Sequence, residues 1–239
     1  MRMNQRFLSV IIGLLIGFFS VTLNVWAAGA TVTGKVVYQG DPVTQKPINF
    51  GAEKQCALMH GDQVPMSEEI VVNSNGTLKS ALVYIKEEIP NAQAPAAPVT
   101  INQKGCVFSP HVSAAMVGQP VDFINDDALL HNVRTVSKAN KLFNIAQPIQ
   151  GMKTTKKFDQ PEIGIQLRCD VHFWMVSYLH VLSHPYFAVT AEDGSFSIEG
   201  LPAGTYTLEM WHEKLGTQSQ TITVQEGESK AIDFSVAGK

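Results

Sequence analysis

Short runs in which apolar and polar residues alternate fill most of this 239-residue chain. Residues 31–40 (TVTGKVVYQG) and 68–87 (EEIVVNSNGTLKSALVYIKE) show the alternation typical of strands, and Asn75-Gly76 indicates a hairpin turn within the second run. The same pattern recurs, with turn residues between the runs, in residues 118–126, 163–169, 176–183 and 187–236. The sequence therefore predicts an all-β fold of antiparallel sandwiches, with no helix of appreciable length.

The N-terminus has the layout of a secretory signal peptide. Arg2 and Arg6 precede an apolar run from Phe7 to Phe19, and small residues suited to cleavage lie around position 27. The run is short for a membrane span, which needs about 20 apolar residues. We expect residues 1–27 to be removed and the mature protein to be exported without a membrane span; an uncleaved anchor is the alternative.

The charge balance excludes several classes of function. Loss of Arg2 and Arg6 would reduce the 18 Lys+Arg to 16 against 21 Asp+Glu, a net charge of −5. A chain without a basic block does not suit nucleic acid. The sequence also shows no nucleophile–base pair, phosphate loop or carboxylate dyad. We therefore expect a protein that is not an enzyme.

Residues 169–175, CDVHFWM, bring together three side chains that bind soft metals. Cys169, His172 and Met175 are each three residues apart, so one loop between two strands can direct all three at a common centre. Electron-transfer copper sites combine a thiolate, two imidazoles and a weak axial thioether, whereas zinc sites rarely use Met. The motif therefore predicts one type 1 copper ion, with zinc as the weaker alternative.

His131 is the candidate for the remaining ligand. It follows the predicted strand 118–126 and a short polar loop, and it leads into another strand-like run, NVRTV. A second loop at the same end of a sandwich must close the site, and we expect His131 to lie there. The neighbouring Asn132 is expected to support the site by tying the two ligand loops together.

The three cysteines of the mature chain suggest one disulfide in an oxidising compartment. A copper ligand must be a free thiolate, which assigns Cys169 to the metal and predicts a bridge between Cys56 and Cys106. An alternative is a second soft-metal site formed by Cys56, Met59 and His60 in the segment CALMH.

Two aromatic residues, Phe173 and Trp174, flank His172 on the ligand loop. They are candidates for an apolar surface that docks a redox protein partner, since such transient interfaces are small. Packing between two sandwiches is the alternative role for Trp174.

From about residue 99 to residue 181 the chain resembles the cupredoxins, the small blue copper proteins, and its C-x2-H-x2-M loop resembles that of the amicyanin type. The resemblance implies a Greek-key sandwich with His131, Cys169 and His172 as equatorial ligands and Met175 as axial ligand. The loop departs from the family where Phe173 replaces the usual proline.

The stretches HPYFAVT and DGSFSIEGLPAGTYTLEMWHE resemble exported bacterial proteins that combine a cupredoxin with a carboxypeptidase-regulatory-like, or transthyretin-like, sandwich. Some of those relatives are labelled methylamine-utilisation proteins. The resemblance implies a cupredoxin domain at 97–183 inserted into a second sandwich made of 29–92 and 184–239. The Pro/Ala-rich stretch 90–98 agrees with such a border.

We therefore expect a monomeric, periplasmic one-electron carrier that uses the Cu(I)/Cu(II) couple. The complete Cys-His-His-Met set and the lack of a Met cluster favour electron transfer over a second class, copper storage or delivery. A third class, a metal-free sandwich that binds a protein or glycan, would make CDVHFWM a packed loop.

Overall fold

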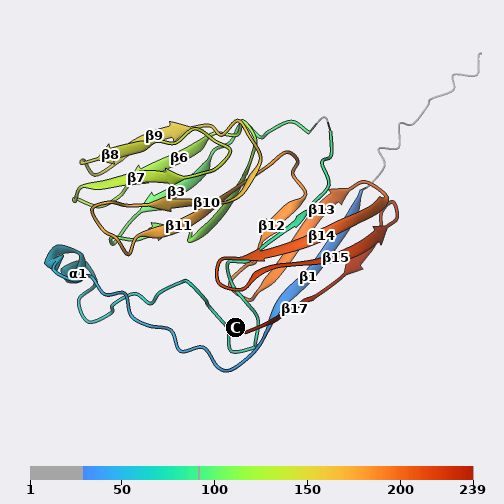
Figure 1. The fold of residues 1–239 in the computed structure, drawn as a ribbon, viewed down its shortest axis with the longest axis horizontal. Coiled ribbons are helices and arrows are strands. Elements are labelled where there is room, and N and C mark those ends of the chain that lie inside the picture. The colour runs from blue at the N-terminus through green and yellow to red at the C-terminus, as the bar shows by residue number, and fades with distance from the viewer. Residues whose placement is uncertain (1–28, 91, 239) are drawn as a thin grey trace, which may run out of the picture.

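The computed structural model describes residues 29–90 and 92–238, and these residues are almost entirely β-structure (Figure 1). They form two sandwiches, so the predicted all-β fold is confirmed. The predicted signal peptide, 1–27, lies outside the described residues. Within the described ranges, no helix has the length and apolar character needed to cross a membrane.

The first sandwich, here called the inserted sandwich, spans residues 99–182. Its strands are β3 (Val99–Gln103), β4 (Phe108–Ser109), β5 (Val112–Met116), β6 (Val121–Asn125), β7 (His131–Val136), β8 (Asn144–Gln147), β9 (Met152–Lys156), β10 (Glu162–Arg168) and β11 (Val176–Leu182). One sheet has the order β5-β11-β10-β7-β8 and the other β4-β3-β6-β9. The pairs β3–β6 and β5–β11 are parallel, because the chain crosses between sheets instead of returning by hairpins throughout.

The alternation seen in the sequence is the alternation of inward and outward side chains. On β10, Ile165 and Leu167 are fully buried, while Gln166 between them is only half-buried. Phe123 on the facing sheet belongs to the same apolar core. This core supports the end of β10, from which the loop 169–175 starts, and the start of β7, where the loop 126–130 ends.

The second sandwich, here called the outer sandwich, combines the two ends of the chain. Its strands are β1 (Ala30–Gln39), β2 (Leu82–Ile85), β12 (Phe187–Val189), β13 (Ser195–Leu201), β14 (Gly204–His212), β15 (Gly216–Val224), β16 (Ser229–Ala231) and β17 (Phe234–Ala237). β1 pairs with β13, β16 and β17, and the second sheet has the order β12-β2-β14-β15. Leu78, Leu208 and Phe234 lie in its core.

Aromatic and imidazole side chains fill the contact between the sandwiches. Trp211 of β14 lies against β11, with its ring centre 5.2 Å from that of Tyr178 and 4.5 Å from that of His180. His180 accepts the Gly164 N–H at 3.1 Å, and burial lowers its pKa to about 3. It is therefore a neutral packing residue.

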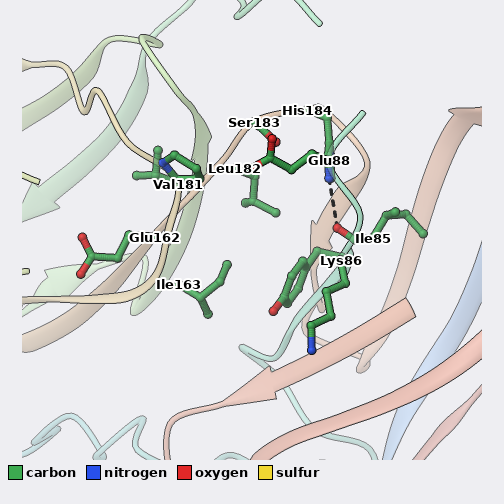
Figure 2. Close-up of a pocket in the computed structure, with 11 residues that line it drawn as sticks. Ile85, Lys86, Glu88, Glu162, Ile163, Val181, Leu182, Ser183 and His184 are labelled. Carbon is green, nitrogen blue, oxygen red and sulfur yellow. Dashed lines mark hydrogen bonds between the residues drawn. The ribbon is translucent and has the colours of Figure 1, made fainter. Parts of the chain in front are cut away.

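A cavity of about 230 Å³ lies at the same junction (Figure 2). Its wall includes Glu162 and Leu182 from the inserted sandwich and Lys86 from the outer one. His184 donates to the Ile85 carbonyl at 3.0 Å across its edge. The His184 imidazole thus joins the segment between β11 and β12 to the end of β2.

Residues 40–69, here called the strap, leave the outer sandwich and run beneath the inserted one (Figure 1). They contain a short helix, α1 (Lys54–His60), that the sequence did not predict. Phe50 and Cys56 of the strap belong to the core of the inserted sandwich. The hairpin turn predicted at Asn75-Gly76 is present: the Asn73 N–H donates to the Thr77 carbonyl at 2.8 Å, and Val72 bridges to Leu78. Thr77 also bridges to Val37 of β1, so the run 68–87 forms a short hairpin followed by β2 instead of two long strands.

Candidate metal centre

The ligand candidates lie at one end of the inserted sandwich because of strand pairing. His131 is the first residue of β7, and Cys169 directly follows β10. These two strands are antiparallel neighbours, with Arg134 opposite Arg168. The start of β7 therefore lies beside the end of β10, and the loop 169–175 folds back over the gap to reach β11.

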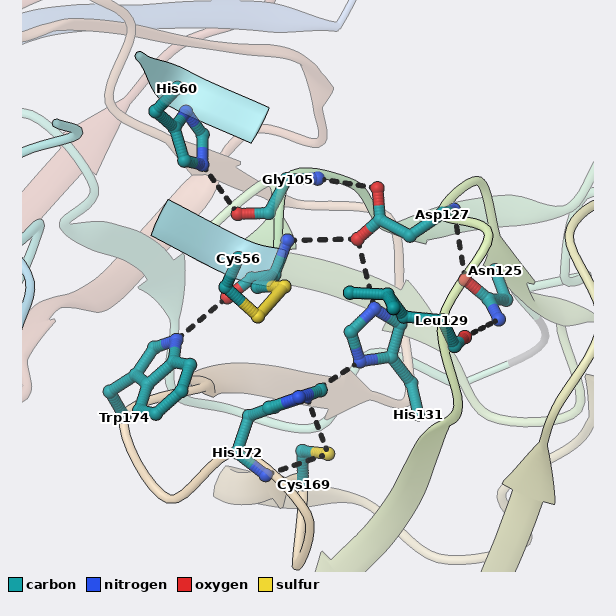
Figure 3. The surroundings of a disulfide bond; sticks show 11 residues. Cys56, His60, Gly105, Asn125, Asp127, Leu129, His131, Cys169, His172 and Trp174 are labelled. Atoms are coloured by element: carbon teal, nitrogen blue, oxygen red, sulfur yellow. Dashed lines mark hydrogen bonds and ion pairs between the residues drawn. A yellow bond between two sulfur atoms is a disulfide. The ribbon is translucent and has the colours of Figure 1, made fainter. Parts of the chain in front are cut away.

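Three of the predicted ligands meet in a buried cluster (Figure 3). The Nδ1 atoms of His131 and His172 are 2.9 Å apart, and the Cys169 Sγ lies 3.8 Å from the His172 Nδ1. The exposed fractions of His131, Cys169 and His172 are 0%, 2% and 3%. Water therefore has little access to the donor atoms.

Backbone hydrogen bonds close the ligand loop. Cys169 N–H donates to the Met175 carbonyl at 3.2 Å, and Met175 N–H donates to the His172 carbonyl at 2.9 Å. The His172 N–H lies 3.4 Å from the Cys169 sulfur and points a donor at it. Met175 is buried in the same core as Cys169. The tight turn therefore closes the loop that carries Cys169, His172 and Met175.

Asn132 joins the two ligand loops. Its side-chain oxygen accepts the Asp170 N–H at 2.7 Å and lies 3.3 Å from the Cys169 sulfur. Its amide donates to Asn144 on β8 at 2.7 Å. Asn132 thus holds the first residues of the loop 169–175 against β7, which begins at His131, and against β8.

The surroundings favour the thiolate form of Cys169. Burial alone would raise its pKa, but hydrogen bonding to His131 and to backbone N–H groups outweighs burial and lowers the pKa. Burial and the nearby His131 lower the pKa of His172, which favours its neutral form. A thiolate and a neutral imidazole are the forms that bind metal.

This donor set fits copper. A soft thiolate and two imidazole nitrogens converge, and a thioether lies on the same loop. The carboxylates that a zinc site would favour are engaged elsewhere. Asp127 contacts the far side of His131 at 2.9 Å, and Asp170 pairs with Arg134 at 2.7 Å.

The strap covers this end of the sandwich. A disulfide joins Cys56 of α1 to Cys106, with a Cα–Cα distance of 5.7 Å. His60 donates to the Gly105 carbonyl at 2.8 Å, and Met59 is exposed. The alternative soft-metal site of Cys56, Met59 and His60 is therefore not formed, because the sulfur and the imidazole are already bonded.

Phe173 and Trp174 have different environments. Phe173 is 67% exposed. Trp174 is half-buried, packs on His172 with ring centres 5.2 Å apart, and donates to the Cys106 carbonyl at 2.9 Å. Trp174 does not take the alternative role of packing between the two sandwiches. It contacts the turn at Cys106 and Phe50 of the strap.

Comparison with known proteins supports the two-part fold. Residues 181–237 match the family model of the carboxypeptidase regulatory-like domain, as the resemblance predicted. No protein of curated function matches the chain.

Solved structures similar to this chain include cupredoxins. A purple cupredoxin from Nitrosopumilus maritimus is 22% identical, with 35% of this chain and 98% of that chain covered and a TM-score of 0.31. A methionine-to-alanine mutant of amicyanin with Cu(I) is 18% identical, with coverages of 41% and 97% and a TM-score of 0.32. A copper-containing nitrite reductase from Thermus scotoductus SA-01 is 21% identical, with a TM-score of 0.34; 40% of this chain covers 24% of that chain.

Proposed function

We propose that this protein is an exported type 1 copper protein that carries single electrons and catalyses no reaction of its own. One ion would be held by His131, Cys169 and His172, with Met175 as the axial ligand. The observation that supports this most directly is the pair of buried Nδ1 atoms 2.9 Å apart beside the Cys169 sulfur.

The protein's own contribution would be a fixed, dry ligand set. When bound, copper supplies the one-electron Cu(I)/Cu(II) couple. Asn132 fixes the relative position of the two ligand loops, and the backbone bonds within 169–175 keep the loop closed. Trp174 and the disulfide region cover His172 and limit the entry of water. A site that cannot rearrange much favours electron exchange over ligand exchange.

The first test is a titration of the purified mature protein with Cu(II), followed by visible absorption and EPR. We expect an intense thiolate-to-copper band that saturates at one equivalent, and reversible bleaching by a one-electron reductant. A tightly bound ion without that band would instead indicate copper storage or delivery. A protein that binds no copper would be a metal-free binding module, and the proposal would fail.

The proposed partner surface surrounds the ligand loops. The loops beside His131 and Cys169 carry four exposed apolar residues: Leu130, Ile149, Val171 and Phe173. Ile149 belongs with the others because His131 pairs with Gln147, two residues before it. Exposed apolar patches often mark protein-interaction sites. We propose that a small redox protein docks there.

Phe173→Ser is expected to slow electron exchange with a protein partner several-fold while leaving the copper absorption unchanged, because Phe173 is exposed and is not a ligand. Stopped-flow reduction by a small cupredoxin or cytochrome would measure the rate. Leu142→Ser is the matched control, since Leu142 is 60% exposed but lies near the far end of β7, where the Thr135 N–H bonds to Phe143. Equal rates for the two variants would contradict a docking role.

A further inference from the structure

Asp127 is a buried carboxylate that the proposed ligand set does not use. It is only 4% exposed, and its Oδ2 accepts the Nε2 proton of His131 at 2.9 Å (Figure 3). The opposite nitrogen of the same ring, Nδ1, faces His172. The carboxylate therefore contacts the ring on the side away from the metal position.

Asp127 is itself held by a tight turn. Gly105 N–H donates to its Oδ1 at 2.7 Å, and Cys106 N–H donates to its Oδ2 at 2.8 Å. Both turn residues have left-handed backbones, with φ of 63° and 55°. Successive N–H groups in a turn can form a concave site for an anion. The carboxylate thus has fixed donors on one side and the His131 ring on the other.

The strap in turn clamps this turn. Cys56 binds the Cys106 side chain through the disulfide, and His60 donates to the Gly105 carbonyl. A Cβ added at Gly105 would come within 2.7 Å of the His60 ring, so the close approach requires glycine. A continuous set of bonds therefore runs from α1 through the turn and Asp127 to His131.

We propose that Asp127 is a positioning residue for the copper centre, which holds His131 with its Nε2 protonated and its Nδ1 free to bind metal. The proposal rests on the copper function above. A carboxylate behind a ligating imidazole fixes its tautomer and orientation and raises its basicity. A more basic imidazole stabilises Cu(II) more than Cu(I), so Asp127 should lower the reduction potential.

Asp127→Asn keeps the shape of the side chain and removes its charge. We expect Cu(II) affinity to fall about tenfold relative to Cu(I) affinity, within the range known for loss of such partners. For a one-electron couple, a tenfold change corresponds to an upward shift of about 59 mV in potential. Spectroelectrochemistry of the copper-loaded protein measures both the potential and the absorption spectrum.

Asp122→Asn is the matched control. Asp122 is equally buried on β6, but it bonds to Lys153 at 2.8 Å and to Thr155, away from the ligands. We expect its potential and spectrum to match the wild type. If Asp127→Asn shows the same potential and spectrum as Asp122→Asn, the positioning role is wrong.

Metal-free wild-type protein gives a second test that needs neither copper nor a folded variant. Long-range ¹H–¹⁵N NMR, recorded at a pH high enough for His131 to carry a single proton, should show that proton on Nε2 and an unprotonated Nδ1. A proton on Nδ1 with Nε2 bare would overturn the proposal. Failure of the wild type to bind copper would instead contradict the proposed function, so the two failures are distinguishable.

Discussion

Cys169→Ser is expected to abolish the thiolate-to-copper absorption band completely and to weaken Cu(I) binding more than Cu(II) binding. The band requires a copper–thiolate bond, and Cys169 is the free cysteine among the residues the structure describes. A serine hydroxyl is a hard, neutral ligand, whereas Cu(I) prefers soft thiolate and thioether sulfur. Visible absorption and competition with a Cu(I) chelator would measure the two effects.

The fold should survive this substitution, because Ser replaces Cys with little change of volume at a site whose backbone bonds remain. The Cys56→Ser/Cys106→Ser variant is the control: it also removes sulfur near His172 but should keep the band. A band that persists in Cys169→Ser, or disappears only in the control, would assign the thiolate to another cysteine and contradict the proposed ligand set.

Much of the fold could be predicted because its signals are local. The period-two alternation at Ile165 and Leu167 reports burial directly, and the turn residues mark where strands end. The segment that matches the carboxypeptidase regulatory-like family carries its own sequence pattern. In the run 68–87 the hairpin turn at Asn75-Gly76 is confirmed, but alternation could not show how short the paired segments on either side of the turn are.

Helix α1 could not be predicted for a similar reason. Seven residues are too few to show a helical period, and the helix lacks a side-chain cap at its N-terminus. What stabilises it is tertiary: the Cys56 disulfide and the burial of Phe50 against the inserted sandwich. These contacts join residues far apart in the chain, and no local pattern encodes them.

The candidate site divides in the same way. Cys169, His172 and Met175 lie within one loop, so their spacing alone indicates a metal site. His131 could be chosen because it starts a strand after a polar loop. Asp127 could not be chosen from the sequence. Its role depends on hydrogen bonds from Gly105 and Cys106, which lie about 20 residues earlier in the chain. The cover over His172 depends equally on long-range contacts.

Loss of the disulfide, in Cys56→Ala/Cys106→Ala, is expected to lower the free energy of unfolding by about 4 kcal/mol. The bridge closes a loop with a sequence separation of 50, and the chain-entropy relation gives about that value for a loop of this length. The bridge stabilises the fold by restricting the unfolded chain, and its removal returns that entropy to the unfolded state. Guanidinium unfolding followed by tryptophan fluorescence would measure the change.

The loss should be concentrated in the strap, the 105–106 turn and the inserted sandwich, whose core contains both cysteines. The core of the outer sandwich is formed without the bridge. Hydrogen exchange should accelerate in α1 while amides of β14 keep their protection. His60→Ala is the matched control, since it removes one strap bond to Gly105 and should cost only about 1 kcal/mol. A double variant no less stable than His60→Ala would show that packing, and not the covalent link, holds the strap over the metal loop.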